Sequence, residues 1–372
     1  MSKKIAMLFP YSPSYREAIY KLMDEQLDID WFFCGNAHRH LKFMDYSLLK
    51  YCNLSMEEKR LFGPIRYYKG IRKLELYRYD VIICPGVIRS LSEWWLLWRI
   101  GRGMKKTSIF LWTHGWYGRE SFVQKVLKKI FFKKVDGFFL YGDYAKNLMI
   151  NERFEKDKLH VIKNSLDYEK QLSIRNNISI SDIYKNYFKN EYPTIIFIGR
   201  LTEEKKLDYL IKAIAVLKDR GENCNVVLVG NGVMYEALQT EVTRFGLENR
   251  FWFYGESFDE KKNAELIYNA DMCVSPGNIG LTAIHTLMFG CPALSHSCYE
   301  KQGPEFEAII PGYTGDFFEY GNVDDLARCI SHWLSGSAEK RELIREACYA
   351  EVDKYWNPRY QIDVIKSVLE IQ

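Results

Sequence analysis

Residues 275–282 read SPGNIGLT and form a glycine-containing turn in the predicted fold. It follows an apolar segment at 272–274 and leads into a helical pattern that runs to Phe289. The first backbone N–H groups of a helix lack partners and the helix dipole places partial positive charge there, so this order of strand, turn and helix favours an anion. For such a turn taken alone, closing a tight connection is the commoner role of the glycines. The residues that would hold the anion are Asn278, Gly280, Leu281 and Thr282.

A second loop of the same kind follows the apolar segment 194–198. Gly199 and Arg200 come directly after this predicted strand, and Lys205 lies a few residues further on. Arginine offers a planar fork of donors that suits phosphate oxygens, and lysine offers a point charge. Ligands of doubly wound sheets bind beyond the carboxyl ends of the strands, so the two loops together predict a diphosphate site. Either lysine of the run 203–206 taken alone is better explained as a solvated charge.

The chain is long enough for two domains. Its 372 residues exceed the roughly 250 to 300 at which one core stops growing. Nine cysteines without a Cys-x-x-Cys pair indicate reduced thiols and a cytoplasmic protein. The tryptophan-rich run at 94–98 ends at Arg99, short of the roughly 20 apolar residues that span a bilayer. The apolar run before Pro10 is too short for a secretory signal.

Charge is divided unevenly along the chain. Residues 1–190 hold 34 Lys and Arg against 20 Asp and Glu, and residues 191–372 hold 18 against 28. The positively charged first half could bind nucleic acid, an anionic membrane or an acidic ligand. The negatively charged second half argues against a protein that wraps around a polyanion such as nucleic acid. We therefore expect no nucleic-acid partner.

A basic amphipathic helix is predicted at 125–134, with apolar residues on one side and lysines mostly on the other. Such a helix can lie on an anionic bilayer surface. An ordinary surface helix with a solvated lysine face explains the pattern equally well. The tryptophans nearby in the sequence favour a peripheral contact with the inner face of a membrane.

Two series of short apolar runs alternate with helix-length segments, as in parallel α/β sheets. The first series lies at 5–9, 30–33, 81–84, 108–112, 137–141 and 160–162. The second lies at 194–198, 225–229, 251–254, 272–274, 293–295 and 315–318, with helices at about 206–220, 233–245, 260–268 and 281–289. We expect doubly wound domains at 1–170 and 193–355, a polar linker at 171–192 and a ligand in the cleft between the domains.

The second half resembles the family-four glycosyltransferases, which are retaining enzymes of the GT-B fold. The matching motifs read FIGRL at 197–201, LVGNG at 228–232, FYG at 253–255, GL at 280–281 and GCP at 290–292. The resemblance is strong over roughly 194–335 and rests on few residues in the first half, chiefly Thr113-His114-Gly115. It implies two Rossmann-like domains facing across a cleft, the first on the acceptor side, with a last helix at 358–372 that crosses back to it.

By this resemblance, Arg200 and Lys205 neutralise the diphosphate leaving group of a nucleotide-sugar, and backbone N–H groups near Leu281 and Thr282 complete the site. Fixed cations can stabilise a departing diphosphate without a metal, so we expect neither metal nor cofactor. His38 and His40 form a pair that no carboxylate or cysteine completes as a ligand set, and we interpret them as surface residues.

The resemblance also assigns the remaining parts of the donor site. The nucleotide base lies near Gly230 and the loop at 254–258. His114 follows the strand at 108–112 and contacts the donor sugar or the acceptor; a loop histidine with a purely structural role is the alternative. The glycine-rich first loop of the family is missing, and residues 10–16 stand in its place.

This chain departs from the family at two positions that usually hold glutamates, where it has Gly277 and His285. A neutral imidazole at 285 can still hydrogen-bond a ribose hydroxyl, whereas glycine offers only backbone. Glu305 is our hypothesis for a replacement acid.

The sequence predicts a retaining glycosyltransferase that moves a sugar from a nucleotide-diphosphate donor to a glycan or polyprenyl-linked acceptor in surface polysaccharide synthesis. Two alternatives stay open: a non-catalytic GT-B nucleotide-sugar-binding module, because both glutamates are absent, and a nucleotide-sugar epimerase. The base, sugar, acceptor, linkage and oligomeric state are not indicated.

Overall fold

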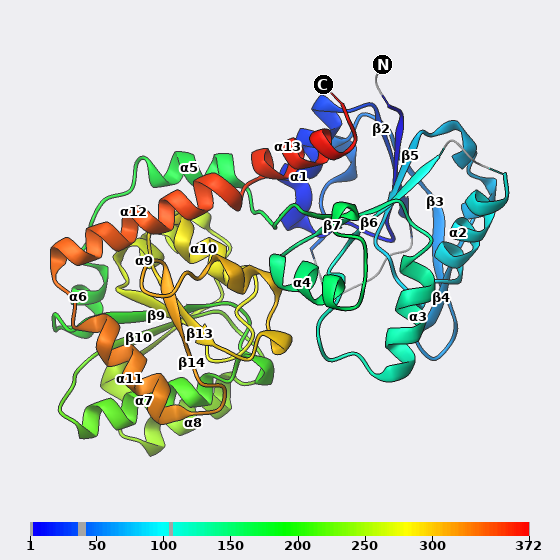
Figure 1. Ribbon diagram of the computed structural model, residues 1–372. Helices are drawn as coiled ribbons and strands as arrows, with labels where there is room; N and C mark the ends of the chain where they lie inside the picture. Colours follow the sequence, from blue (N-terminus) through cyan, green and yellow to red (C-terminus); the bar gives the residue numbers. More distant parts are fainter. Residues whose placement is uncertain (1–2, 36–41, 104–106, 372) are drawn as a thin grey trace. The chain divides into compact units, whose positions relative to one another are not determined.

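The protein consists of two compact units (Figure 1). The computed structural model describes residues 3–35, 42–103 and 107–371. One unit comprises Met1–Asp167 with Asn357–Gln372, and the other comprises Tyr168–Trp356. The histidines at 38 and 40 lie outside the described residues.

The amino-terminal unit is built on an eight-stranded sheet in the order β4-β3-β2-β1-β5-β6-β7-β8. Its neighbouring strands are parallel except β3 and β4. The strands are β1 (Ile5–Leu8), β2 (Ile29–Cys34), β3 (Cys52–Phe62), β4 (Ile65–Lys69), β5 (Val81–Cys84), β6 (Ser108–Thr113), β7 (Gly137–Leu140) and β8 (Leu159–Val161). The helices are α1 (Glu17–Gln26), α2 (Leu91–Gly103), α3 (Phe122–Phe132), α4 (Asp143–Asn151) and α13 (Pro358–Val368).

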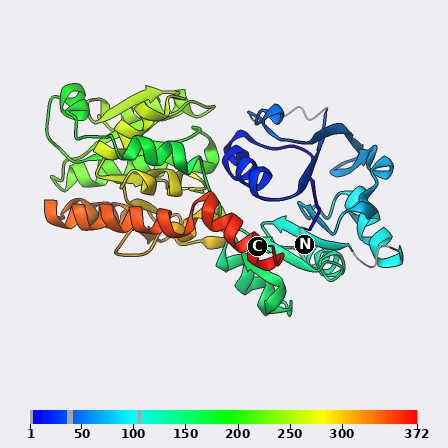
Figure 2. The same cartoon turned by 90° about the horizontal axis from the view of Figure 1, so that it is seen from above.

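Alternate residues of the central strands point to opposite faces of this sheet and fill two cores. Met7 of β1 lies in a cluster with Ile362 of α13, whereas Leu8 lies in a cluster with Phe131 of α3. Because α13 packs against α1 and β8, the last helix belongs to this unit. The two ends of the chain lie close together here (Figure 2), with Lys3 Nζ 3.4 Å from Glu370 Oε2.

The hairpin of β3 and β4 was not predicted from the sequence. β3 carries the charged run 57–60 and has a single fully buried side chain, Met56, so no alternating apolar pattern marks it. The strand forms because it pairs with β2 on one side and with β4 on the other, through a turn in which Gly63 has a φ of 51°.

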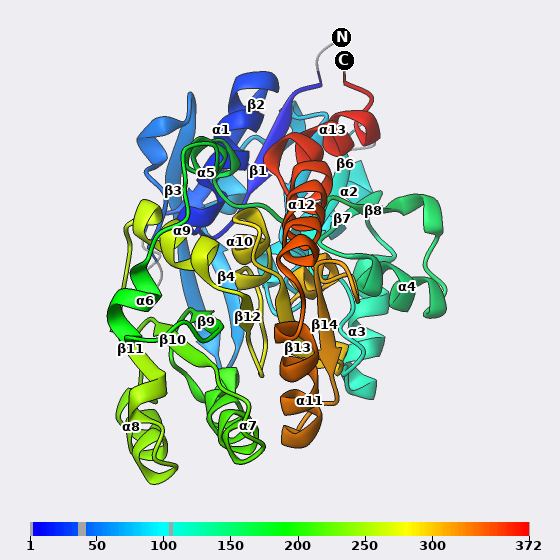
Figure 3. The same ribbon diagram turned by 90° about the vertical axis from the view of Figure 1, so that its left-hand side faces the viewer.

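The carboxyl-terminal unit contains a six-stranded parallel sheet in the order β11-β10-β9-β12-β13-β14. Helices α7, α8 and α11 cover one face, and α9, α10 and α12 cover the other (Figure 3). The strands are β9 (Thr194–Ile198), β10 (Asn225–Val229), β11 (Phe251–Gly255), β12 (Met272–Val274), β13 (Ala293–His296) and β14 (Gly315–Phe318). The helices are α5 (Tyr168–Arg175), α6 (Ile183–Phe188), α7 (Leu207–Asp219), α8 (Tyr235–Arg244), α9 (Glu260–Asn269), α10 (Thr282–Met288), α11 (Val323–Leu334) and α12 (Ala338–Tyr355).

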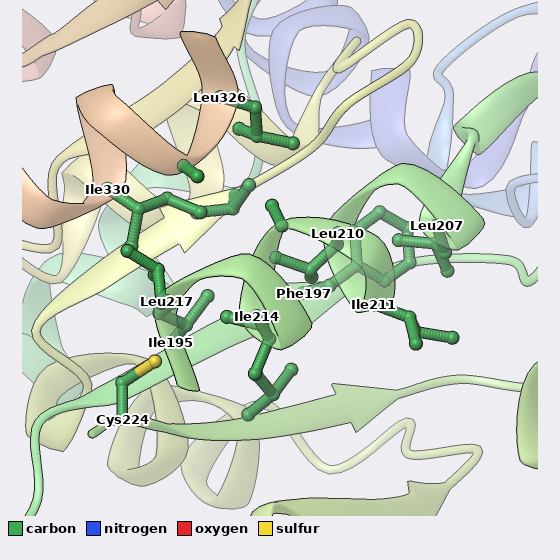
Figure 4. Close-up of a cluster of buried hydrophobic side chains, with 14 of the residues drawn as sticks. Ile195, Phe197, Leu207, Leu210, Ile211, Ile214, Leu217, Cys224, Leu326 and Ile330 are labelled. Carbon is green, nitrogen blue, oxygen red and sulfur yellow. The ribbon is translucent and has the colours of Figure 1, made fainter. Parts of the chain in front are cut away.

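The core under α7 and α11 holds this unit together. Leu210 and Ile214 of α7 pack with Phe197 of β9 and Ile330 of α11, and each is at most 2% exposed (Figure 4). Every strand predicted in either series is present to within one residue at each end. Two doubly wound α/β domains are therefore confirmed.

The predicted linker at 171–192 is partly helical, because α5 and α6 lie in or across it. Polar contacts anchor both helices, and the aromatic side chains of α6 also pack on the ring of Trp252, through Tyr184, Tyr187 and Phe188. Gln171 donates to the Glu260 carboxylate at 2.8 Å, and the Tyr184 hydroxyl donates to the Leu266 carbonyl oxygen at 2.5 Å. The two hydrogen bonds leave no periodic signal in the sequence. Among the described residues, no helix has the length and apolar content needed to cross a bilayer.

Candidate functional site

Two loops meet at the carboxyl edge of the second sheet, where the strand order reverses. β9 pairs in parallel with β10 on one side and with β12 on the other. Ligands of doubly wound sheets bind at such a point. Residues 199–206 follow β9 and residues 275–281 follow β12, so the structure places the two predicted loops on neighbouring strands.

Hydrogen bonds join these loops. The Gly277 N–H donates to the carbonyl oxygen of Lys205 at 2.9 Å, and the Lys205 ammonium donates to the carbonyl oxygen of Asn278. The Asn278 side-chain amide donates to the Glu204 carboxylate at 3.0 Å and accepts from the Gly303 N–H at 2.7 Å. Asn278 is therefore fixed by contacts from two other segments of the chain.

Gly277 lies where the loops touch, and it has no space for a side chain. A Cβ atom there would lie 1.9 Å from the carbonyl oxygen of Glu204 and 2.8 Å from the Cα of Lys205. The backbone of Gly277 does not have a positive φ, so the close approach alone requires glycine. A glutamate, which the family resemblance places here, does not fit this backbone.

Backbone N–H groups at the start of α10 are available to an anion. Those of residues 280–282 make no hydrogen bond with any described residue. The neighbouring Ile279 N–H is taken by Gln302 Oε1 at 3.0 Å, and the Thr282 hydroxyl donates to the Ile198 carbonyl oxygen at 2.9 Å. The predicted positions Gly280, Leu281 and Thr282 thus offer main-chain donors, which suit a phosphate.

The two cations of the first loop differ in their surroundings. Arg200 is exposed, and its guanidinium forms no ion pair or hydrogen bond within the part of the chain that the structure describes. Lys205 is half-buried, and burial lowers the pKa of its ammonium group. The positive charge of Arg200 lowers this pKa further, whereas the negative charges of Glu204 and Glu305 raise it. These influences place Arg200 and Glu305 near Lys205.

Glu305 lies in the short 3-10 helix η9 (Pro304–Ala308) and is 4% exposed. A Cβ atom at Gly303 would lie 2.9 Å from Glu305 Oε2 and 3.2 Å from Asn278 Oδ1. The structure therefore brings Glu305 to the same group of residues as Asn278 and Lys205.

His285 lies one turn into α10 and pairs with a carboxylate that the sequence did not reveal. Its Nε2 is 2.9 Å from Glu260 Oε1 of α9, which also accepts from Gln171. Burial would raise the pKa of Glu260, but its contacts with His285 and Gln171 prevail, so that pKa lies below its usual value. Glu260 opens a helix, where acidic residues are common, and nothing in the sequence distinguishes it.

Gly199 and Gly230 follow adjacent strands and touch each other. A Cβ atom at Gly230 would lie 1.9 Å from the Gly199 carbonyl oxygen, and Gly230 has a φ of 144°. The Gly230 N–H donates to the Gly255 carbonyl oxygen at 2.7 Å. The region predicted to hold the nucleotide base is thus formed by closely packed backbone.

His114 belongs to the amino-terminal unit, where it lines a cavity of about 540 Å³. Its ring centroid lies 4.7 Å from that of Tyr141 and 5.6 Å from that of Tyr117. Although part of the side chain is exposed, the surrounding atoms desolvate it, and with the charges of Arg16 and Lys128 they lower the pKa of His114 to about 4. The imidazole is therefore neutral at physiological pH.

The basic helix α3 has the opposite orientation to an ordinary surface helix. Its lysines face the protein: Lys125 and Lys129 both contact the Glu152 carboxylate, and Lys128 lies 2.6 Å from Glu120. Its apolar side is exposed instead, through Phe122, Val123, Val126, Leu127 and Ile130.

Comparison with known proteins identifies relatives of this chain. Residues 180–350 match the family of glycosyl transferases group 1. An uncharacterized glycosyltransferase of Methanocaldococcus jannaschii is 26% identical over 255 residues, which cover 67% of this chain and 62% of the relative. The match thus spans about three fifths of that relative's length. A GDP-mannose-dependent phosphatidylinositol dimannoside mannosyltransferase of Mycobacterium tuberculosis is 32% identical over 103 residues, 27% of this chain and 26% of the relative.

Solved structures extend the likeness to the whole chain. The Anabaena protein HepE in complex with UDP gives a TM-score of 0.70 at 15% identity, covering 99% of this chain and 100% of HepE. The lipopolysaccharide outer core galactosyltransferase WaaB gives 0.67 at 16% identity, covering 99% of both chains. At such identities the likeness shows the fold alone, and this fold is GT-B, as predicted.

Proposed function

We propose, from the match of residues 180–350 to the family of glycosyl transferases group 1, that the protein moves a sugar from a nucleotide-diphosphate donor to an acceptor hydroxyl. The observation that carries this proposal is the junction of the loops after β9 and β12. That junction carries Arg200, Lys205 and the unpartnered N–H groups of residues 280–282 on adjoining segments.

Cleavage of the sugar–phosphate bond leaves negative charge on the diphosphate and positive charge on the sugar. Fixed cations and main-chain donors stabilise the diphosphate most where water is excluded. Lys205 is held by its bond to Asn278, whereas Arg200 is exposed and has its guanidinium donors available to phosphate oxygens. This division of roles requires no divalent metal, and we expect turnover to persist in EDTA. Retention of anomeric configuration is proposed from the family resemblance.

Neutral His114 is proposed to hydrogen-bond a hydroxyl of the donor sugar or acceptor, and Glu305 to act as an acid near the donor. If Glu305→Gln turns over as fast as the unsubstituted enzyme, Glu305 has no such role. For the acceptor we propose a glycan or polyprenyl-linked hydroxyl of a surface polysaccharide; WaaB, by its name, acts on lipopolysaccharide.

A panel of UDP-, GDP- and dTDP-sugars tests the donor site. HepE has been solved with UDP-glucose, and one relative is named as GDP-mannose-dependent, so both bases belong in the panel. Thermal shift and release of the diphosphonucleotide are followed for each donor. Removing Arg200 should cost about 1.5 to 3 kcal/mol, or roughly 10- to 150-fold in Kd, the range for hydrogen bonds to charged groups.

Arg220→Ala is the matched control for Arg200→Ala. Arg220 is an exposed arginine of the same unit that follows α7 at its carboxyl end, so its loss changes the net charge equally. Donor affinity should fall in Arg200→Ala alone. Equal losses in both variants, or no stabilisation of the protein by any donor, would overturn the proposed donor site. Tight binding without transfer to any acceptor would favour a non-catalytic binding module.

We further propose that α3 docks on an anionic membrane surface. Phe122 is 81% exposed and Ile130 is 49% exposed, at opposite ends of one apolar stripe. The exposed cations Arg119, Lys133 and Lys134 lie just beyond the two ends of the helix. An apolar stripe with cations at its margins suits the boundary between acyl chains and anionic headgroups.

Flotation with vesicles tests this surface. The protein should float with vesicles that contain phosphatidylglycerol and much less with neutral phosphatidylcholine vesicles, and Val126→Glu with Ile130→Glu should abolish flotation. Val233→Glu is the control, because Val233 is 85% exposed in the other unit. Identical flotation on both vesicle types, or self-association of the protein that the double substitution removes, would refute the membrane contact.

A further inference from the structure

The cavity of the amino-terminal unit contains a cation whose charge is balanced by no carboxylate among the described residues. Arg16 lies in the short 3-10 helix η1 (Ser14–Arg16), which precedes α1 and borders the cavity. Its Nη1 donates to the Tyr20 hydroxyl at 2.9 Å and its Nη2 donates to the Tyr141 hydroxyl. No Asp or Glu forms an ion pair with Arg16 in the described chain, and its buried Nε makes no hydrogen bond.

Aromatic rings surround this guanidinium. Its Cζ lies 5.4 Å from the ring centroid of Trp112, 5.6 Å from that of Phe9 and 5.7 Å from that of Tyr141. A ring face stabilises a cation less than a paired carboxylate does in a desolvated site. Burial tends to lower the pKa of Arg16, but the phenol oxygens of Tyr141 and Tyr20 raise it, so the charge persists.

The other ionisable groups of the cavity leave this positive charge in excess. Arg66 is paired with Glu58 at 2.8 Å, and Lys128 is paired with Glu120 at 2.6 Å. Arg89 is exposed and forms no ion pair in the described chain. Two cations of this cavity, Arg16 and Arg89, therefore lack an acidic partner.

Two further groups beside the cavity add little charge of either sign. Buried Glu93 accepts hydrogen bonds from the Val87 N–H at 2.9 Å and from the Tyr68 hydroxyl at 3.3 Å, behind the cavity wall. Burial raises the pKa of Glu93 to about 7, so much of this carboxyl group is protonated at neutral pH. His114 is neutral there because its pKa is about 4.

We infer that the acceptor carries an anionic group, a carboxylate or a phosphate, and that Arg16 binds it in this cavity. A desolvated cation is costly without a counter-charge, and the ligand supplies it. The aromatic lining provides apolar surface for the faces of sugar rings, while Arg16 fixes orientation, which is the usual division between apolar and polar groups in a ligand site. This inference rests on the proposed transfer function, since it names the class of acceptor for the same reaction.

Two sugar probes of matched size and one lipid phosphate test the charge requirement. Methyl glucuronide carries a carboxylate, methyl glucoside is its neutral counterpart, and farnesyl phosphate represents the phosphate of a lipid carrier. Binding to the full-length protein is measured by saturation-transfer NMR and calorimetry. We expect at least one anionic probe to bind at least tenfold more tightly than methyl glucoside, and the preferred probe tells an acidic sugar from a lipid phosphate.

Substitutions locate the effect. Arg16→Gln should bring the anionic probe to the affinity of the neutral one, and Arg16→Lys should restore part of the difference. Arg89→Gln, at an exposed position, should weaken the anionic probe about two- to fivefold and serves if Arg16→Gln does not fold. Equal affinity of the unsubstituted protein for charged and neutral probes refutes the inference, as does an unchanged preference in Arg16→Gln or, where that variant does not fold, in Arg89→Gln.

Nucleotide binding separates the two proposals. It is measured on the same samples with the donor identified by thermal shift, and the Arg16 variants should retain it. A protein that binds nucleotide-sugars but shows no preference for an anionic probe loses only the present inference. A protein that binds no nucleotide-sugar loses the transferase proposal.

Discussion

Gly277→Ala is expected to damage both the stability and the donor affinity of the carboxyl-terminal unit. The new Cβ would lie 1.9 Å from the Glu204 carbonyl oxygen, whereas side-chain carbons essentially never approach closer than 3.0 Å. The loops after β9 and β12 must therefore separate by about 1 Å. This movement stretches the 2.9 Å hydrogen bond from the Gly277 N–H to Lys205 and shifts the Lys205 ammonium from Asn278.

The magnitude follows from these two effects. Overpacking costs about 1 to 3 kcal/mol and a weakened hydrogen bond about 1 kcal/mol, so the free energy of unfolding should fall by about 2 to 4 kcal/mol. For a domain of this size the melting temperature should then fall by roughly 5 to 15 °C. Displacement of Lys205 should weaken the best nucleotide-sugar at least tenfold, and Gly277→Glu should behave worse.

Differential scanning fluorimetry and nucleotide titration measure both quantities. Gly336→Ala is the control, because a Cβ there meets the flexible end of Lys340 at 3.3 Å and the backbone has no positive φ. If Gly277→Ala melts within about 2 °C of this control, a difference worth less than about 1 kcal/mol for a domain of this size, and keeps its nucleotide affinity, the close approach of the loops is not what requires glycine.

Three other perturbations have defined outcomes. Glu93→Gln should remove a pH dependence of stability. The pKa of Glu93 in the folded protein, about 7, exceeds its ordinary value of 4.5. The stability that Glu93 contributes is therefore fully present below pH 4.5 and is lost as pH rises through 7, a change of about 3 kcal/mol in the free energy of unfolding. Urea unfolding from pH 4.5 to 8 measures it, and an unchanged slope in the variant contradicts the assignment. His285→Ala should lower the free energy of unfolding at pH 7 by about 1 kcal/mol. Because the pKa of Glu260 is depressed in the folded protein, the difference in stability between this variant and the unsubstituted protein should vanish as pH falls through that pKa. A stability difference that is independent of pH would be evidence against the pairing of His285 with Glu260. Leu210→Ala should cost about 2 to 5 kcal/mol in denaturant unfolding, because this fully buried side chain fills the core under α7; a loss below 1 kcal/mol would mean that the core closes over the cavity.

Several of the strands that the sequence predicted have an unbroken apolar signal. β9, β10 and β12 consist entirely of buried residues, so their apolar runs identify them without any knowledge of their neighbours. The neighbouring loops could then be placed together, because parallel strands bring their carboxyl ends to one edge of a sheet. Arg200 and Lys205 were found in this way from position alone.

The role of Arg16 could not be predicted from its position in the sequence, because its environment is assembled from distant parts of the chain. Phe9 follows β1, Trp112 lies in β6 and Tyr141 follows β7. In the sequence, nothing distinguishes any of these three residues from other apolar residues near strand ends. That no carboxylate among the described residues pairs with Arg16 can be recognised only when all the neighbours of Arg16 are known. The same holds for β3, whose charged residues are acceptable because the strand lies near the edge of its sheet.

The two family glutamates are absent from the sequence, yet a carboxylate stands close to each of the positions they would occupy. Glu260 reaches His285 from α9 at 2.9 Å, and Glu305 lies in η9, beyond β13, near Asn278 and Lys205. The backbone explains this exchange at Gly277: the loops are joined too closely to admit a side chain, so a carboxylate can enter only from another element. In the proposed reaction, the charge needed near the donor would be a property of the folded site, and a sequence motif records it only when the same element supplies it. The absence of both glutamates is therefore weaker evidence for an inactive binding module than the sequence alone suggests.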